Sequence, residues 1–379
     1  MPEYQATIRP VREVEDLEVS WRRLVAQSKC SFFLSWDWAA TTIEVSGDSL
    51  LVAEIKSSQG VVALGLLAPV TEVRHGVMSF SQLCLNETGP DPARSVLIEY
   101  NTLLAAPEVG APAWEALLQA LDVAGVPHWD EIVVKNATVD LETSLKAYGL
   151  NIYRRAISGS AYVDLADLRA RGVDTVEGYC AGLGGSTRRQ IARSIKLYEE
   201  RGALTVDRAM TPEEGCLYLE EIKKLHKAKW HARGTYNEAS TEYLYAFHRK
   251  LISRTIERGG VELVRISAGG EPFAWVYNFV DRGQVLFNSG GFIVENDNRL
   301  KPGLVAHALL IAEHIKAGRD IYDFLAGDDR YKLNLGQPGP TFVGFAIQRS
   351  TLFLRIERVL RRVKHSLAGA QGLHSPPFS

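Results

Sequence analysis

The chain has 379 residues, which is long enough for two domains with sizeable cores, and its formal net charge at pH 7 is only −2. This balance excludes a global basic field for nucleic acid, so any basic site must be local. The N-terminal stretch lacks a basic region followed by an apolar one, and no segment approaches about 18 uncharged apolar residues, so we expect neither signal peptide nor membrane span. The four cysteines form no C-x-x-C pair and are expected to be reduced thiols of a cytoplasmic protein.

Two pairs of segments repeat in the same order along the chain. Residues 49–70 and 260–280 each contain a β-rich run, a glycine turn and a second β-rich run. Residues 117–136 and 309–328 each contain an apolar helical pattern that passes through Ala-Gly into a strand. The repeat predicts two α/β domains of similar build.

We place the two domains at residues 1–155 and 156–367 and expect a loose tail at 368–379. The predicted elements of the second domain are helices at 186–202, 211–234 and 240–257, strands at 261–267, 272–280 and 284–292, a helix at 304–318, a strand from 321, a strand after Gly336 and an amphipathic helix at 351–367. Its order is therefore helices, a three-strand meander, and then alternating helices and strands.

A polar loop with two cations precedes the predicted helix at 304–318. It contains Asn298, Arg299, Lys301 and Gly303. Free backbone N–H groups and the positive end of the helix dipole favour a bound phosphate or pyrophosphate, and a glycine lets the backbone approach such a ligand. The structural alternative is an ordinary Pro-Gly loop. The pattern is not a Walker or Rossmann fingerprint.

The stretch 321–332 joins an apolar run to a tyrosine and a lysine. Asp323 lies between Ile321 and Leu325 in the run, and Tyr331 and Lys332 follow a turn. Apolar surroundings would raise the pKa of Asp323 unless a cation pairs with it. The structural alternative is a salt bridge beside a packed tyrosine.

Several segments together resemble the GNAT acyltransferase superfamily. They are YVDL (162–165), STRRQIARSIKLYEERG (186–202), LHKAKWHARG (225–234), GEPFAWVYNF (270–279) and YDFLAGDDRYK (322–332). More narrowly, the chain resembles the cellulose-biosynthesis-associated acetyltransferases, which are akin to Fem-type aminoacyltransferases with two GNAT units in one chain. The resemblance covers roughly residues 160–340. It implies an α/β protein with two tandem GNAT-like domains, each a mixed, mostly antiparallel sheet flanked by helices.

The resemblance also implies roles at the predicted site. GNAT enzymes often have a tyrosine general acid after the strand that corresponds to the one before Tyr331. A phenol can donate a proton to a thiolate if the surroundings shift its pKa modestly. Lys332 would stabilise an oxyanion or a phosphate. Asp323 would be either a base for the ammonium nucleophile or the clamp that fixes Lys332. The carrier phosphates would bind the loop at 298–303.

Other residues are expected near the acceptor. His226 and Arg233 could reach substrate, Trp230 could form a pocket wall, and Tyr277 lies in one of the resembling segments. Glu87 lies in an acidic loop at about the place where the second half has its anion loop. We expect the first domain to lack carrier binding and Glu87 to hold a cationic amine instead, with an irregular surface loop as the alternative.

Metal binding is not expected, because no H-E-x-x-H or Cys/His cluster occurs. Histidines such as His307 and His314 are therefore predicted to be satisfied in the core or exposed. Two basic helical segments, at 186–202 and 351–367, are solvated faces or contact surfaces. The second could rest on an anionic membrane surface, which would place the protein at the inner face of the membrane.

The predicted function is N-acyl transfer by direct attack. A coenzyme A thioester, or an acyl carrier protein, would be the donor co-substrate, with no tightly bound cofactor. The acceptor would be an amine on a cell-envelope sugar, a lipid or an amino-acid-like molecule. One alternative is Fem-like aminoacyl transfer from charged tRNA. The other is a non-catalytic binding module in polysaccharide assembly.

Overall fold

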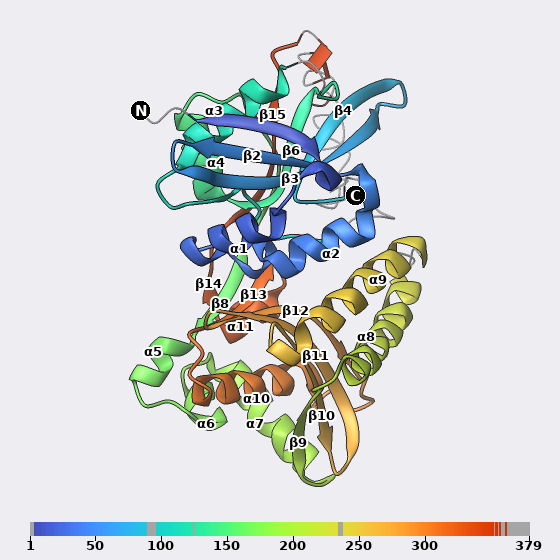
Figure 1. The fold of residues 1–379 in the computed structure, drawn as a ribbon. Helices are drawn as coiled ribbons and strands as arrows, with labels where there is room; N and C mark the ends of the chain where they lie inside the picture. The colour runs from blue at the N-terminus through green and yellow to red at the C-terminus, as the bar shows by residue number, and fades with distance from the viewer. Residues whose placement is uncertain are drawn as a thin grey trace. The chain divides into compact units, whose positions relative to one another are not determined.

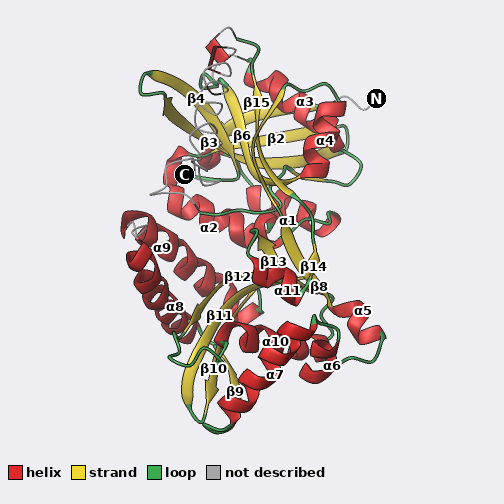
Figure 2. Cartoon of the chain, turned by 180° about the vertical axis from the view of Figure 1, so that it is seen from behind, coloured by secondary structure: helices red, strands yellow, loops and turns green. Residues whose placement is uncertain are grey.

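The fold was analysed in a computed structural model, which describes residues 4–88, 96–123, 126–233, 238–351, 353–354, 356–357 and 361; for 229–233 and 238–240 it describes the backbone only. The chain divides into two compact units, one formed by Met1–Ser158 with Thr341–Ser379 and the other by Gly159–Pro340. Each unit contains a mixed sheet flanked by helices (Figures 1 and 2). The predicted tandem α/β class is therefore confirmed.

The first unit is built on an eight-stranded sheet with the order β1-β2-β3-β4-β6-β15-β7, in which β5 pairs with β3. Its strands are β1 (Gln5–Pro10), β2 (Leu51–Ser57), β3 (Gly60–Arg74), β4 (Met78–Leu85), β5 (Leu104–Ala105), β6 (Glu131–Thr138), β7 (Ile152–Ser158) and β15 (Phe342–Gln348). Its helices are α1 (Leu17–Gln27), α2 (Trp36–Ser46), α3 (Gly110–Leu121) and α4 (Val139–Ala147).

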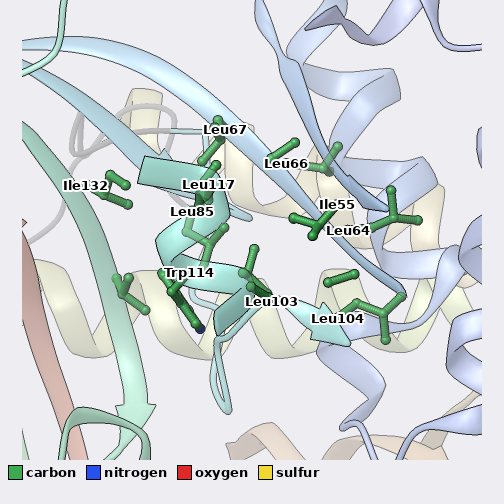
Figure 3. Packing of buried hydrophobic residues seen from close by; sticks show 14 of the residues in the cluster. Ile55, Leu64, Leu66, Leu67, Leu85, Leu103, Leu104, Trp114, Leu117 and Ile132 are labelled. Atoms are coloured by element: carbon green, nitrogen blue, oxygen red, sulfur yellow. The ribbon is translucent and has the colours of Figure 1, made fainter. Parts of the chain in front are cut away.

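Part of the core of the first unit lies between α3 and this sheet. Trp114 and Leu117 of α3 point toward Leu85 of β4 and Ile132 of β6, and all four are buried (Figure 3). The apolar spacing of α3 and the β-rich runs thus bury one shared face, as an amphipathic helix on a sheet must.

The second unit is built on a seven-stranded sheet with the order β14-β8-β13-β12-β11-β10-β9. Its strands are β8 (Ser160–Asp164), β9 (Leu204–Arg208), β10 (Val261–Ala268), β11 (Glu271–Asp281), β12 (Gln284–Phe292), β13 (Ile321–Ala326) and β14 (Gln337–Pro338). Its helices are α5 (Leu165–Ala170), α6 (Val176–Ala181), α7 (Gly185–Glu199), α8 (Pro212–Arg233), α9 (Glu238–Thr255), α10 (Pro302–Lys316) and α11 (Arg330–Leu335).

The two faces of the second sheet carry different helices. Val276 of β11 packs in one cluster with residues of α10, whereas its neighbour Tyr277 bonds His248 of α9. Because successive side chains of a strand point to opposite faces, α10 covers one face and α9 the other. The long helix α8 begins as predicted, since Glu214 N–H donates to the Thr211 hydroxyl and the Glu214 carboxylate accepts from Met210 N–H.

The internal repeat predicted from the sequence is present in the sheets. The strand pairs β2–β3 and β10–β11 occupy matching places, and the helix–strand pairs α3–β6 and α10–β13 each supply the strand that is parallel to its meander. In each unit one parallel pair, β4–β6 or β12–β13, joins an antiparallel meander to the rest of the sheet.

The boundary of the second unit differs from the expected 156–367. The strand after Gly336 forms as predicted, but as β15 it pairs with β6 and β7 of the first unit. A strand signal in the sequence predicts a strand and not its partners, which depend on the hydrogen bonds available at a sheet edge. Within 351–379 the structure describes only Thr351, 353–354, 356–357 and Arg361, so the predicted helix and tail lie mostly outside the described residues.

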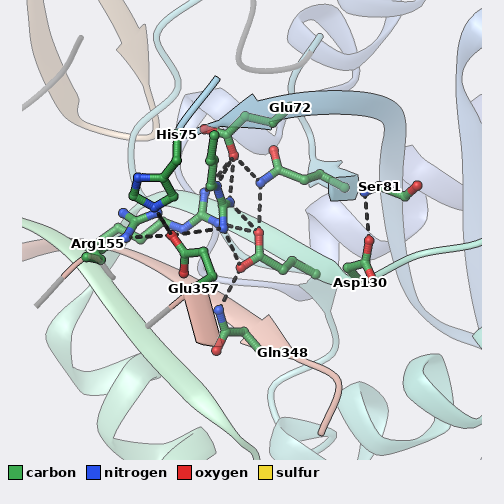
Figure 4. A network of polar contacts seen from close by, with 11 residues as sticks. Glu72, His75, Ser81, Asp130, Arg155, Gln348 and Glu357 are labelled. Carbon is green, nitrogen blue, oxygen red and sulfur yellow. Dashed lines mark hydrogen bonds and ion pairs between the residues drawn. The ribbon is translucent and has the colours of Figure 1, made fainter. Parts of the chain in front are cut away.

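A buried polar network fastens β15 into the first sheet (Figure 4). Glu131 of β6 is fully buried and accepts hydrogen bonds from Gln348 of β15, Arg155 of β7 and Arg74 of β3. Burial raises the pKa of Glu131, but the two arginines and Gln348 outweigh it and lower that pKa to about 2. The carboxylate therefore stays charged and links strands that are far apart in the sequence.

We expect Phe345→Ala, in β15, to destabilise the first unit by about 3–5 kcal/mol, because Phe345 is fully buried in the core of that unit. Amide hydrogen exchange should show lost protection in β6 and β7 and unchanged protection in β10 and β11. The matched variant Phe324→Ala, in β13, should give the reverse pattern. Loss in the second sheet with Phe345→Ala would contradict the assignment of β15.

Candidate active site

The parallel ladder between β12 and β13 is short. It joins residues 284–286 to 321–323, whereas β12 continues to Phe292 paired with β11. Beyond the ladder, β13 bends at Leu325, whose φ is 60°, and at Gly327, whose φ is 133°. We call the place where the pairing stops, flanked by Phe287 and Phe324, the ladder end. Backbone groups of β12 beyond this point lie outside the ladder.

Asp323 and Lys332 hold this bend of β13. The Asp323 carboxylate accepts a hydrogen bond of 2.7 Å from Leu325 N–H. The Lys332 ammonium donates to the carbonyls of Ala326, at 2.6 Å, and Leu325, at 3.3 Å. A Cβ on Gly327 would lie 2.7 Å from the Lys332 nitrogen, so a glycine is needed both for the backbone angle and for the lysine.

This arrangement bears on the roles expected of the pair. Asp323 and Lys332 are 4% and 6% exposed, and the lysine nitrogen points to backbone carbonyls. Both side chains thus bond the backbone of β13 in this structure. The expected roles, base or lysine clamp for Asp323 and oxyanion or phosphate contact for Lys332, stay predictions.

Tyr331 lies on α11 between two buried rings. Its ring stacks on His307 of α10, with centroids 5.9 Å apart and an interplanar angle of 17°, and meets Phe324 edge-on at 6.1 Å. Burial, and then the nearby Asp329 charge, raise the pKa of Tyr331 well above its usual value. The phenol therefore remains protonated across the physiological range, while its side chain stays half-buried at the ladder end.

The loop before α10 is anchored to α7. Lys301 N–H donates to the buried Ser194 hydroxyl at 2.8 Å, and Glu295 accepts from Arg201 and from the Tyr198 hydroxyl. Pro302 then occupies the first turn of α10. The predicted anion loop thus leads into the N-terminus of α10 and is held in place by α7.

The cations of this loop differ in their freedom. Arg299 is exposed, but its guanidinium donates hydrogen bonds to the Asp297 carboxylate. These bonds lower the pKa of Asp297 to about 2. Lys301 is half-exposed, and the charge of Arg193 on α7 also acts on Asp297. Because Asp297 offsets the charge of Arg299, Lys301 and Arg193 are the stronger candidates for an anion.

The other two residues predicted in this loop are accessible in different degrees. Asn298 is exposed. At Gly303 an added Cβ would make only ordinary contacts, the nearest being 3.5 Å from the Phe292 ring. Space within the protein therefore does not require glycine there, although a closely bound ligand could.

His226 connects α8 to β12 just beyond the ladder. One ring nitrogen lies 3.2 Å from the Gly290 carbonyl and the other 3.2 Å from the Tyr245 hydroxyl of α9. The register of β11 and β12 shifts between Tyr277 and Asn278, which indicates a bulge in β12 at this place. His226 is therefore brought to the site, whereas the side chains of Trp230 and Arg233 lie outside the described part.

Tyr277 has a packing role in this structure. It is fully buried, and its hydroxyl lies 3.3 Å from the ring nitrogen Nδ1 of His248. Burial raises its pKa well above the usual value. A side chain that is closed off in this way does not favour the direct substrate contact that we expected.

Glu87 is buried rather than exposed in an acidic loop. Its carboxylate pairs with the Lys135 ammonium at 2.7 Å, at the matching ladder end of the first unit, where residues 82–84 pair with 131–133. Burial raises the pKa of Glu87, and Lys135 opposes that rise. The amine that Glu87 holds is therefore one of the protein's own, which the acidic composition of the segment could not show.

His307 and Ser194 have placements that the sequence analysis missed. Ser194 is hidden in a basic helix, and only the tertiary contact with Lys301 shows its function. His307 was expected to be satisfied in the core or exposed. It is buried, and its Nδ1 lies 3.0 Å from the Tyr322 hydroxyl, but its Nε2 has no hydrogen-bond partner among the described residues. Its place five residues after Pro302, behind the anion loop, was the available signal.

Comparisons with known proteins agree with this geometry. Residues 185–333 match the family model described as an acetyltransferase (GNAT) domain. This match lies within the second unit and supports an acyltransferase. No curated protein matches the sequence significantly.

Among solved structures the chain is similar to FemX, with a TM-score of 0.57, 12% identity and coverage of 91% of this chain and 98% of that one. It is also similar to the C-terminal domain of a putative lysylphosphatidylglycerol synthetase from Agrobacterium fabrum, with a TM-score of 0.52, 12% identity and coverage of 93% and 96%. It is similar as well to L-PGS from Bacillus licheniformis, with a TM-score of 0.51, 13% identity and coverage of 93% of this chain and 98% of that one. At these identities the likeness shows the fold.

Two further properties follow from the described residues. They contain no group of three or more His, Cys, Asp or Glu side chains that could hold a metal ion. None of the helices in the described ranges is long and apolar enough to cross a lipid bilayer.

We expect Lys332→Met to lower the free energy of unfolding by about 2 kcal/mol or more, because it removes charge-assisted hydrogen bonds inside the protein. Lys316→Met, an exposed site on α10, is the control and should change stability by less than about 0.5 kcal/mol. Urea unfolding followed by fluorescence would measure both. Equal unfolding midpoints for the two variants would rule out a stabilising role for the Lys332 ammonium.

Proposed function

We propose that the protein is an N-acyltransferase that moves an acyl group from a thioester of coenzyme A, or of an acyl carrier protein, to an amine. The observation that carries this proposal is the short β12–β13 ladder beside an anchored, cationic helix N-terminus, within a GNAT acetyltransferase domain. The proposed acceptor is an amine on an envelope sugar, a lipid or an amino-acid-like molecule. The narrower kinship with cellulose-biosynthesis-associated acetyltransferases stays part of this proposal.

The donor would bind with its phosphates at the α10 N-terminus and its thioester arm along β12. The phosphates would meet the first free N–H groups of α10 together with Lys301 and Arg193. Beyond residue 286 the inner edge of β12 lies outside the ladder, so its backbone can hydrogen-bond the amides of an arm. The thioester would then lie near the ladder end and Tyr331.

In the transfer step the neutral amine attacks the thioester carbonyl carbon. The C–N bond forms, the C–S bond breaks, the nitrogen gives up a proton and the leaving thiolate takes one. Because burial keeps Tyr331 protonated, its hydroxyl can donate a hydrogen bond to the sulfur as negative charge develops there. The raised pKa makes complete transfer of the phenolic proton less favourable than it would be for an ordinary tyrosine.

The acceptor would approach from the α8 side. His226 fixes the β12 bulge to α8 and α9 through Gly290 and Tyr245, so these elements would form one wall of the acceptor site. In the first unit the Glu87–Lys135 ion pair lies where the parallel ladder between β4 and β6 ends. This pair supports a first unit without a carrier site.

One observation favours a second donor, a charged tRNA. Arg189, Arg193 and Lys196 are exposed along α7, on the helix that anchors the anion loop. Their spacing of four and three residues places them on one helix face. A polyanion would bind this stripe with a steep dependence on salt, whereas coenzyme A would need few of these charges. Contact with a membrane through 351–367 concerns residues that lie mostly outside the described part.

We expect coenzyme A to bind the wild-type protein saturably in a calorimetric titration and to bind Lys301→Ala about tenfold more weakly, since one phosphate contact is lost. Arg299→Ala should weaken binding less, because Asp297 already engages that guanidinium. Lys316→Ala, at the far end of α10, is the control and should bind normally. If the wild type binds no acyl-CoA but retains tRNA in a salt-dependent manner, the second donor is favoured instead.

We expect Tyr331→Phe to lower kcat by about 10²-fold with little change in the Kd for coenzyme A, because the lost hydrogen bond forms mainly in the transition state. Both limbs of the pH–rate profile should keep their midpoints, since Tyr331 does not titrate in the working range. Steady-state kinetics would measure this on acetyl-CoA with a small primary amine. Turnover within threefold of wild type would exclude the role.

A further inference from the structure

The second unit contains two buried histidine–tyrosine pairs that differ in one respect. In α9, His248 Nδ1 lies 3.3 Å from the Tyr277 hydroxyl, and in α10, His307 Nδ1 lies 3.0 Å from the Tyr322 hydroxyl. Burial lowers the pKa of both imidazoles to about 3, so both are neutral. Only His307 also leaves a buried Nε2 with no hydrogen-bond partner among the described residues.

An orphaned nitrogen of this kind is costly. A buried polar atom without a partner loses its hydration and gains nothing in return, so native proteins rarely keep one unless a water or a ligand supplies the bond. His307 is 1% exposed, and the neighbouring Lys332 charge further disfavours its protonated form. The imidazole therefore offers one unused neutral hydrogen-bonding position.

The rings around His307 lead from the anion loop to the ladder end. Phe292 lies at 6.1 Å, and its ring also approaches Gly303 at the start of α10. Phe287 and Phe324, which flank the ladder end, lie at 4.6 and 5.1 Å, and Tyr331 stacks at 5.9 Å. His307 thus lies between the expected phosphate site and Tyr331, the proposed hydrogen-bond donor to the leaving sulfur.

The spacing along α10 fits the same order. His307 follows Pro302 by five residues, which corresponds to about 7.5 Å along the helix axis. An arm that runs from phosphates at the helix N-terminus to a thioester at Tyr331 must pass this point. Of the rings around the imidazole, Phe292 and Tyr331 are half-exposed, so small rotations of these two would admit the arm.

We propose that His307 is a donor-binding residue: its Nε2 forms a hydrogen bond with an amide or thioester group of a pantetheine-type arm at the ladder end. Tyr322 holds the imidazole from the opposite nitrogen, so the ring that receives the arm is also the ring on which Tyr331 stacks. This inference rests on the proposed acyl-thioester donor.

The test compares two ligands, coenzyme A and adenosine 3′,5′-bisphosphate, which carries phosphates but no arm. His307→Phe keeps an aromatic ring and removes Nε2. We expect it to weaken coenzyme A by about tenfold in a calorimetric titration, the effect of losing one hydrogen bond, and to leave the bisphosphate unchanged. Lys301→Ala should weaken both ligands, since it acts on the phosphates.

Three controls separate this role from a structural one. His248→Phe removes the matching buried imidazole and should not change the binding of either ligand. His307→Gln, whose amide reaches the position of Nε2, should retain more affinity than His307→Asn, whose amide reaches only Nδ1. Thermal unfolding of each variant checks that the fold persists.

The outcomes distinguish the inference from the proposed function. If the wild type binds coenzyme A and His307→Phe binds it equally well, or loses both ligands equally, the role of His307 is overturned and the donor class stands. The same holds if His248→Phe reproduces the effect. If the wild type binds no thioester donor, both proposals fall together.

Discussion

The candidate site depends on one constraint, the early end of the parallel ladder between β12 and β13. Three residue pairs hold the strands together, and the buried Asp323 and Lys332 then turn β13 away by bonding its own backbone. This uses polar groups inside the protein to satisfy a strand that has left its neighbour, as buried backbone groups require. After the bend comes α11, whose Tyr331 lies against Phe324 of β13 and His307 of α10.

The loop before α10 is held by several contacts. Ser194 and Tyr198 of α7, together with Arg201 just after that helix, anchor it. Near the ladder end lie the half-exposed rings of Phe292 and Tyr331 and the buried Nε2 of His307, which has no hydrogen-bond partner among the described residues.

The first unit repeats the architecture but not the chemistry. Its parallel ladder also has three pairs, yet the following residues form a buried Glu87–Lys135 ion pair rather than an opening with a neutral imidazole. Its sheet is completed by β15 from the far end of the chain, held by the Glu131 network. A fold repeated within one chain can thus keep its packing while the side chains at matching positions differ.

Local patterns in the sequence determined much of this protein. Apolar spacing and capping residues predicted α7, α8 and α9, turn glycines predicted the meander β10–β12, and the repeat of helix–strand pairs predicted two similar units. These features depend on neighbours in the chain. The loop before α10 and the place of Tyr331 after β13 also followed from order along the chain, whereas anion binding by that loop stays a prediction.

Only the tertiary structure decided which residues meet. It assigned β15 to the first sheet, turned Lys332 toward the carbonyls of Leu325 and Ala326, and buried Glu87 against Lys135. It also placed His307 Nδ1 beside the Tyr322 hydroxyl. Each outcome depends on a partner distant in sequence or on a bend set by two positive backbone angles. Residue type states what a side chain can do, but burial and partners, which are long-range properties, decide what it does.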